Sequence, residues 1–327
     1  MKKKLLILLL AGAMIITSLA GCGSTSSGKE EVIQTQNNAM DANTEVEVTT
    51  EEETVTKEAK ANEYYEAGRA CLYRLDGAEI NLEDAYNNFE KAVELGKVDA
   101  NFYLGLLCDW YNYPKTDYEM AKNYYEKCEN NPYANINMGL LYLNGCGVDE
   151  DKEKAKEIFQ TVIEQGYIEG YYGNACIAYE EEDYNAAYEY LNKVVEEGTE
   201  QLYIADAMVG VGSLYCDGYC VEQDFAKALE LYTKALDLGS VEAMSNMGML
   251  YDNGAGVEQD YAKALEWYEK AVALGSKTGM NNIGVMYYFG NGVEQSYEKA
   301  LEWCEKAAAL GNKTAEANAE AIRKRMQ

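Results

Sequence analysis

The chain has no histidine, only two prolines, and half as many basic residues as acidic ones, 28 against 56. Without histidine, Ser-His-Asp and Cys-His catalytic arrangements are impossible, and most transition-metal sites lose a preferred ligand. The formal net charge of −28 opposes electrostatic binding to nucleic acid and to anionic lipid. We therefore expect no enzymatic activity, no metal, no cofactor and no nucleic-acid partner. The scarcity of proline leaves long stretches free to form helices.

The most informative stretch is a direct repeat at residues 243–314. It consists of two segments of 36 residues, AMSNMGMLYDNGAGVEQDYAKALEWYEKAVALGSKT and GMNNIGVMYYFGNGVEQSYEKALEWCEKAAALGNKT. Gly248 in the first segment matches Gly284 in the second, and Tyr251 matches Tyr287. A fixed period of this length is typical of a solenoid, in which each unit packs on its neighbours.

Each segment predicts two helices joined by a turn. Residues 243–251 are apolar and lack a β-branched run, which favours a first helix. Gly248 inside it costs about 1 kcal/mol relative to alanine, so we expect another helix backbone to come close there. Asp260 is a good N-cap for a second helix at 261–274. Gly275 then suits the left-handed position that follows a helix.

The same pattern extends through residues 61–314 as seven units, numbered 1 to 7 in chain order. The residues aligned with Gly248 are Ala70, Gly105, Gly139, Cys176, Gly212, Gly248 and Gly284. The residues aligned with Asp260 are Asn81, Asp117, Asp151, Asp183, Asp224, Asp260 and Ser296, all of them good N-cap types. Capping did not enter the alignment, so this agreement supports it independently. We expect a capping helix at 315–327, which a solenoid needs to remain soluble.

These residues carry a family resemblance. The strings LYLNGCGV, from Leu141, and NMGMLYDNGAGVEQDYAKALEWYEKAVALG, from Asn246, look like Sel1-like repeats. The resemblance implies a right-handed α-solenoid of antiparallel helical hairpins, related to tetratricopeptide repeats, and an adaptor that assembles proteins. Unit 2 departs from the pattern with Tyr113-Pro114 in place of the Gly-rich loop, and unit 4 has a short turn between Tyr179 and Ala187.

The N-terminus reads as a targeting segment. Three lysines at 2–4 precede an apolar stretch at 5–19, as in a signal peptide at 1–21. Leu19-Ala20-Gly21-Cys22 resembles a bacterial lipobox, which implies lipidation of Cys22, with palmitate among its acyl chains, and anchoring to the bacterial cell membrane outside the cytoplasm. An ordinary secretory signal with an incidental cysteine is the alternative. Residues 22–60 are polar and acidic, so we expect a disordered tether.

The other eight cysteines form no regular pairs. We interpret five of them as buried free thiols that act as small hydrophobic residues. These five are Cys71, Cys108, Cys128, Cys176 and Cys304. The spacing of Cys216 and Cys220 allows a disulfide bridge between them, but nothing else in the sequence supports one.

Four asparagines are the candidate binding residues. Asn137, Asn174, Asn246 and Asn282 each lie two residues before the glycine position of a first helix. Stacked first helices would place them in a ladder on the concave face, where an amide offers both a donor and an acceptor to a peptide. The resemblance to tetratricopeptide folds implies such a role. An equally open interpretation is that these amides link neighbouring repeats.

Together these features predict a lipid-anchored, extracytoplasmic scaffold that binds a protein or peptide in its concave groove. The alternative is a structural or sensory envelope lipoprotein that recognises cell-wall material. A hydrolase or β-lactam-binding protein is a third class, but the chain offers no nucleophile–base pair for it.

Overall fold

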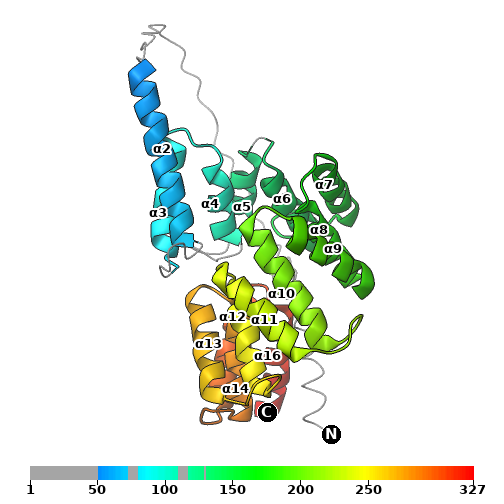
Figure 1. Ribbon diagram of the computed structural model, residues 1–327. Coiled ribbons are helices and arrows are strands. Elements are labelled where there is room, and N and C mark those ends of the chain that lie inside the picture. Colours follow the sequence, from blue (N-terminus) through cyan, green and yellow to red (C-terminus); the bar gives the residue numbers. More distant parts are fainter. Residues whose placement is uncertain (1–50, 73–79, 110–116, 129) are drawn as a thin grey trace.

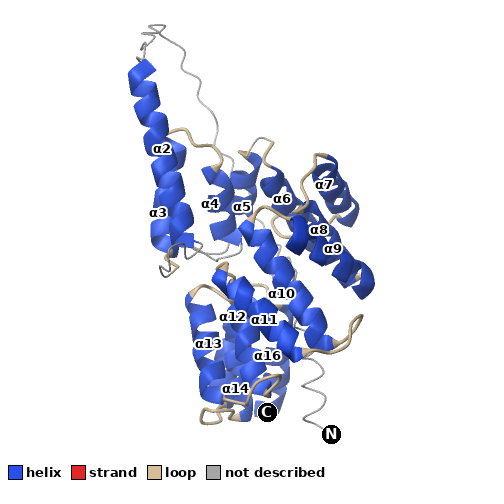
Figure 2. Cartoon of the chain, viewed as in Figure 1, coloured by secondary structure: helices blue, strands red, loops and turns tan. Residues whose placement is uncertain are grey.

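The computed structural model describes residues 51–72, 80–109, 117–128 and 130–327. These ranges contain fifteen helices and no strand, and consecutive helices stack side by side into a curved array (Figures 1 and 2). The expected all-α solenoid is confirmed. None of the helices in these ranges is both long and apolar enough to cross a membrane.

Consecutive helices pair into hairpins, each corresponding to one unit of the sequence pattern. The pairs are α2 (Glu51–Leu72) with α3 (Leu82–Glu94), α4 (Ala100–Asp109) with α5 (Tyr118–Glu126), α6 (Pro132–Asn144) with α7 (Lys152–Glu164), α8 (Gly170–Glu180) with α9 (Tyr184–Glu197), α10 (Gln201–Asp217) with α11 (Phe225–Asp237), α12 (Val241–Asn253) with α13 (Tyr261–Ala273), and α14 (Lys277–Phe289) with α15 (Tyr297–Ala309). Helix α16 (Lys313–Met326) packs on α15 and closes the array.

The predicted N-caps are all in place. Each of the seven side chains accepts a hydrogen bond from the backbone N–H three residues further on, as Asp260 does from Lys263 at 3.0 Å. The other six caps are Asn81, Asp117, Asp151, Asp183, Asp224 and Ser296. Each bond satisfies a donor that the helix leaves free at its first turn, and this fixes where each second helix begins.

The first helix begins earlier than expected. Helix α2 starts at Glu51, whereas residues 22–60 were expected to form a disordered tether, so that boundary was wrong. The sequence from Lys57 to Ala61 consists of lysine, glutamate and alanine, which all favour helix. A helix can therefore form here although the segment has no long apolar stripe. Residues 1–50, with the predicted signal peptide, Cys22 and the rest of the tether, lie outside the described residues, as does Tyr113-Pro114.

In several hairpins the interior is built on a contact between a glycine of the first helix and an aromatic ring of the second. A Cβ atom added to Gly139 would stand 2.4 Å from the ring of Phe159, and one added to Gly212 would stand 2.6 Å from the ring of Tyr232. Both rings belong to the second helix of the same unit. A close approach is present at these glycines as expected, but the nearest neighbour is an aromatic ring and not the helix backbone that was expected.

The Gly-rich loops are closed by a repeated hydrogen bond. Gln259 Nε2 donates to the carbonyl oxygen of Asp252 at 2.7 Å, and Gln295 Nε2 donates to that of Tyr288 at 2.7 Å. Gly254 ends α12 with φ of 66°, a left-handed conformation that glycine adopts without strain. These loops therefore hold consecutive helices in a fixed hairpin.

Candidate functional site

The four asparagines predicted to form a binding ladder are not equally accessible. Asn137 on α6 is 0% exposed, Asn246 on α12 is 5% exposed and Asn282 on α14 is 9% exposed. Asn174 on α8 is half-buried. Three of the four amides are thus covered by the protein itself, and only Asn174 has substantial surface to offer to a ligand.

Asn137 is held in a contact between units that are not neighbours. The hydroxyl of Tyr203, on α10, lies 3.3 Å from Asn137 Oδ1 and 3.0 Å from the carbonyl oxygen of Tyr133, toward which it donates. The rings of Tyr133 and Tyr203 also stack, with centroids 5.9 Å apart. Unit 5 therefore contacts unit 3 directly, and the inner side of the array is filled at these residues. This geometry favours a packing role for Asn137.

The start of α10 is fixed by a buried carboxylate. Glu169 Oε1 accepts hydrogen bonds from the backbone N–H groups of Thr199 at 2.6 Å and Glu200 at 2.8 Å, and from the Thr199 hydroxyl at 3.0 Å. A carboxylate at a helix N-terminus satisfies free donors and complements the helix dipole. This contact holds in place the residues that cross toward unit 3, and the sequence alone carried no signal for it.

Asn282 belongs to a buried polar network that reaches the capping helix. It forms a hydrogen bond with the hydroxyl of Tyr268, and Asn281 Nδ2 donates to its Oδ1 at 3.4 Å. Asn318 Nδ2, on α16, donates to Asn281 Oδ1 at 2.9 Å. Asn318 follows Asn282 by 36 residues, so the period that identified the ladder also marks this position, which the sequence reading missed. The network joins α13, α14 and α16.

Asn174 lies on an accessible patch of unit 4, which we call the Asn174 surface: Tyr171, Asn174, Tyr190 and Lys193. Tyr171 and Asn174 are three residues apart on one face of α8. The rings of Tyr171 and Tyr190 stack at 5.6 Å, and Lys193 Nζ lies 4.2 Å from the Tyr171 centroid. All four residues are half-buried, and no hydrogen bond of the Asn174 amide occurs within the described residues. The patch offers an amide, aromatic area and a cation.

Three further aromatic residues on first helices, Tyr172 on α8 and Tyr288 and Phe289 on α14, differ in exposure. Tyr172 is buried in the core, whereas Tyr288 and Phe289 are half-buried and contact each other edge to face at 5.0 Å.

Within the described ranges no three cysteine, aspartate or glutamate side chains are grouped so as to hold a metal ion. Asp206, a half-buried acid on α10, has a buried Oδ2 atom without a hydrogen-bond partner among the described residues; burial and then the charge of Glu242 raise its pKa well above the usual value.

All eight cysteines within the described ranges are free thiols. Cys108, Cys128, Cys176 and Cys304 are buried, as predicted, whereas Cys71 is half-buried. Burial raises the pKa of the Cys108 thiol to about 11 and that of Cys304 to about 12. These groups are therefore protonated at neutral pH and are poor nucleophiles. The possible bridge between Cys216 and Cys220 is absent.

Six segments of the chain match the family model of the Sel1 repeat, and together they cover more than half of its length. The matched segments are 59–97, 98–127, 132–167, 205–240, 241–276 and 278–312. Residues 168–204, which hold α8 and α9, lie between two matched segments. No curated protein sequence matches the chain.

Several solved structures of such proteins are similar. A protective antigen of uropathogenic Escherichia coli with an SLR fold is 26% identical, with a TM-score of 0.33, and the match covers 85% of this chain and 68% of the antigen. A Sel1 repeat protein from Oxalobacter formigenes is 22% identical, with a TM-score of 0.40, over 89% of this chain and 88% of that one. The repeat matches alone carry the family assignment.

Proposed function

Because the chain belongs to the Sel1 repeat family, we propose that it is a non-enzymatic scaffold that binds another protein or peptide, held outside the cytoplasm by a lipid on Cys22. Sel1 repeat proteins are generally scaffolds for protein–protein interaction. The described part of this chain is an array of packed helices whose interior is formed by apolar residues and small-to-large contacts. Such an array presents a preformed surface, so a partner binds without the cost of ordering the scaffold.

The Asn174 surface is the observation that supports the choice of binding site. Among the four ladder asparagines, Asn174 combines substantial exposure with an amide that is not engaged elsewhere in the described structure. The stacked rings of Tyr171 and Tyr190 beside it supply apolar contact area at a low cost in side-chain entropy. An extended peptide would take hydrogen bonds from the amide and packing from the rings.

Photo-crosslinking in intact cells tests this surface. A photoreactive amino acid at position 174 should trap a defined partner, whereas the same group at Glu157, exposed on α7, should not. Asn174→Ala should weaken capture from a neighbouring photoreactive position at Tyr171. Equal capture from 174 and 157 would contradict the assignment of this surface.

Metabolic labelling with an alkyne-bearing palmitate tests the anchor. Cys22→Ser should lose the label and release the protein from the membrane fraction, and Cys71→Ser, a matched cysteine substitution in the folded part, should keep both. Label retained in Cys22→Ser would place the lipid elsewhere or show that the leader is an ordinary secretory signal.

A further inference from the structure

A carboxylate that forms no ion pair with any described residue lies at the hairpin tips of units 4 and 5. Asp217 is the last residue of α10, and its charge acts on the nearby hydroxyl groups of Tyr179, Tyr184 and Tyr219. Asp217 Oδ2 is buried and accepts no hydrogen bond from any described residue. The hydroxyl of Tyr179, a residue only 3% exposed, is likewise buried and unpaired. Each of these two buried atoms thus lacks a hydrogen-bond partner among the described residues.

The tyrosines around Asp217 form a short stack that ends in solvent. The rings of Tyr184 and Tyr219 stack with centroids 4.4 Å apart and planes 21° apart, and Tyr179 meets Tyr184 edge to face at 5.0 Å. Tyr219 is 46% exposed, one of the few large side chains in the described structure that remain this open. One face of its ring is covered by Tyr184, so the exposed part offers a π surface, which attracts cations.

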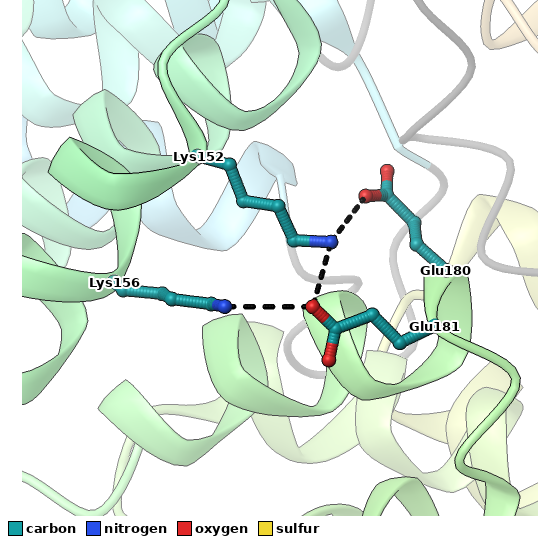
Figure 3. A network of polar contacts seen from close by, with 4 residues as sticks. All are labelled: Lys152, Lys156, Glu180 and Glu181. Carbon is teal, nitrogen blue, oxygen red and sulfur yellow. Dashed lines mark hydrogen bonds and ion pairs between the residues drawn. The ribbon is translucent and has the colours of Figure 1, made fainter.

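Two acidic residues on the adjoining hairpin, unlike Asp217, form ion pairs with lysines. Lys152 Nζ lies 2.9 Å from Glu181 Oε1 and 3.9 Å from Glu180 Oε2, and Lys156 Nζ lies 3.4 Å from the same Glu181 oxygen (Figure 3). These carboxylates have lysines pointing toward them from α7. No ion pair in the described ranges compensates Asp217 in this way.

The position of Asp217 makes its negative charge costly. It ends α10, where the aligned peptide groups give the helix a partial negative charge that repels an anion and attracts a cation. Burial also raises its pKa to about 7. A carboxylate that is desolvated, at the wrong end of a helix dipole and beside an open aromatic ring has the surroundings of a cation-binding group.

We propose that Asp217 and Tyr219 form a docking site for an arginine side chain of a partner protein. The guanidinium would stack on the exposed part of the Tyr219 ring and bond to the Asp217 carboxylate. Arginine fits better than lysine because its planar, weakly hydrated head stacks on aromatic rings and pairs with carboxylates in a fixed geometry. The net charge of −28 steers basic partners toward this protein. Asn174 takes no part in this site, so the two proposals stand or fail separately.

The test is an NMR titration of the full chain, with labelled tyrosine rings, against the blocked peptide Gly-Arg-Gly. We expect a saturable shift of the Tyr219 ring signal, assigned through Tyr219→Phe. Asp217→Asn should weaken binding about tenfold, the scale of one lost charged hydrogen bond. Glu222→Gln, which removes an exposed charge from the same loop, should bind as the wild type does.

Two further comparisons make the result decisive. The same peptide with citrulline, a neutral analogue of arginine, should not shift the Tyr219 signal, and a lysine peptide should bind more weakly than the arginine one. Thermal unfolding of each variant checks that it is folded. No saturable shift at Tyr219, or an equal weakening by Asp217→Asn and Glu222→Gln, would overturn the site and leave only general attraction to an acidic protein.

Discussion

The ring of Tyr268 covers Gly248 so closely that a Cβ atom on Gly248 would stand 2.5 Å from the ring atom Cε1. The carbonyl oxygen of Ala264 would be 3.1 Å from the same atom, and Tyr268 is buried, so neither neighbour can move away freely. Gly105 with Tyr125 and Gly139 with Phe159 repeat this contact. In each case the aromatic ring of the second helix occupies the space where a side chain of the first helix would lie, so the two helices pack closely only if glycine is present.

We therefore predict that Gly248→Ala destabilises the fold, although alanine favours helix by about 1 kcal/mol. Overpacking of a buried contact costs about 1–3 kcal/mol, so the net effect should be a loss of stability in urea unfolding. Tyr268→Leu combined with Gly248→Ala should recover part of it, since unit 4 pairs Cys176 with the smaller Leu191 at these positions. A single Gly248→Ala variant more stable than wild type would contradict the packing argument.

The capping helix offers a second prediction. Asn318→Ala removes the N–H donor that Asn281 Oδ1 receives at 2.9 Å, in a site where both side chains are buried. Asn281 Oδ1 would then keep only a weak contact from the Cys304 thiol at 4.0 Å, and a buried acceptor without a good donor costs about 1–3 kcal/mol. Hydrogen exchange along α16 should accelerate in this variant. Glu316→Gln, at an exposed position on the same helix, should leave exchange almost unchanged, and equal effects of the two substitutions would contradict the role of the network.

The dependence of stability on pH gives a third prediction. Burial raises the pKa of Asp217 to about 7 and that of Asp252 to about 6, from an ordinary value of 3.8. Between about pH 4 and these values, the folded state holds protons that the unfolded state has lost, so each group lowers the free energy of unfolding as pH rises through this range. Above about pH 7 the cost is complete and constant.

The substitution Asp217→Asn isolates this effect. It should raise the free energy of unfolding by about 1–3 kcal/mol at pH 8 and by little at pH 4. The gain at pH 8 is only part of what the full pKa difference between the folded and unfolded states would give. Glu222→Gln serves again as the exposed control. Chemical unfolding at the two pH values is the measurement, and an equal gain at pH 8 and pH 4 would mean that ionisation of Asp217 is not the cause.

Thiol reactivity gives a fourth prediction. Cys71 and Cys220 are half-buried, whereas burial raises the pKa of Cys128 and Cys304 to about 12. Labelling with a thiol reagent at pH 8 followed by peptide mass spectrometry should therefore modify Cys71 and Cys220 first. All eight cysteines of the folded part should react in denaturant. Modification of Cys304 as fast as Cys220 in the native protein would contradict the packing of α15.

Features that depend on residues close together in the chain could be predicted from the amino-acid sequence. The period of 36 residues and the N-caps placed the second helices, because a cap acts on an N–H group only three residues away. Gly248 also marked the close helix contact, since a glycine that returns at the same place in successive units, inside a helix, requires a packing reason. The same internal period predicted the solenoid.

The accessibility of the polar groups, in contrast, depends on the packing of distant units. Asn137 is buried because Tyr203, far along the chain, folds back over it, and Asn174 stays accessible because nothing described covers it in the same way. Asp217 is one of many acids in the sequence, and its lack of an ion pair with the described residues follows from how the tips of units 4 and 5 meet. Burial and charge compensation depend on neighbours brought together from distant units, whereas helix caps and repeat periods are local properties of the chain.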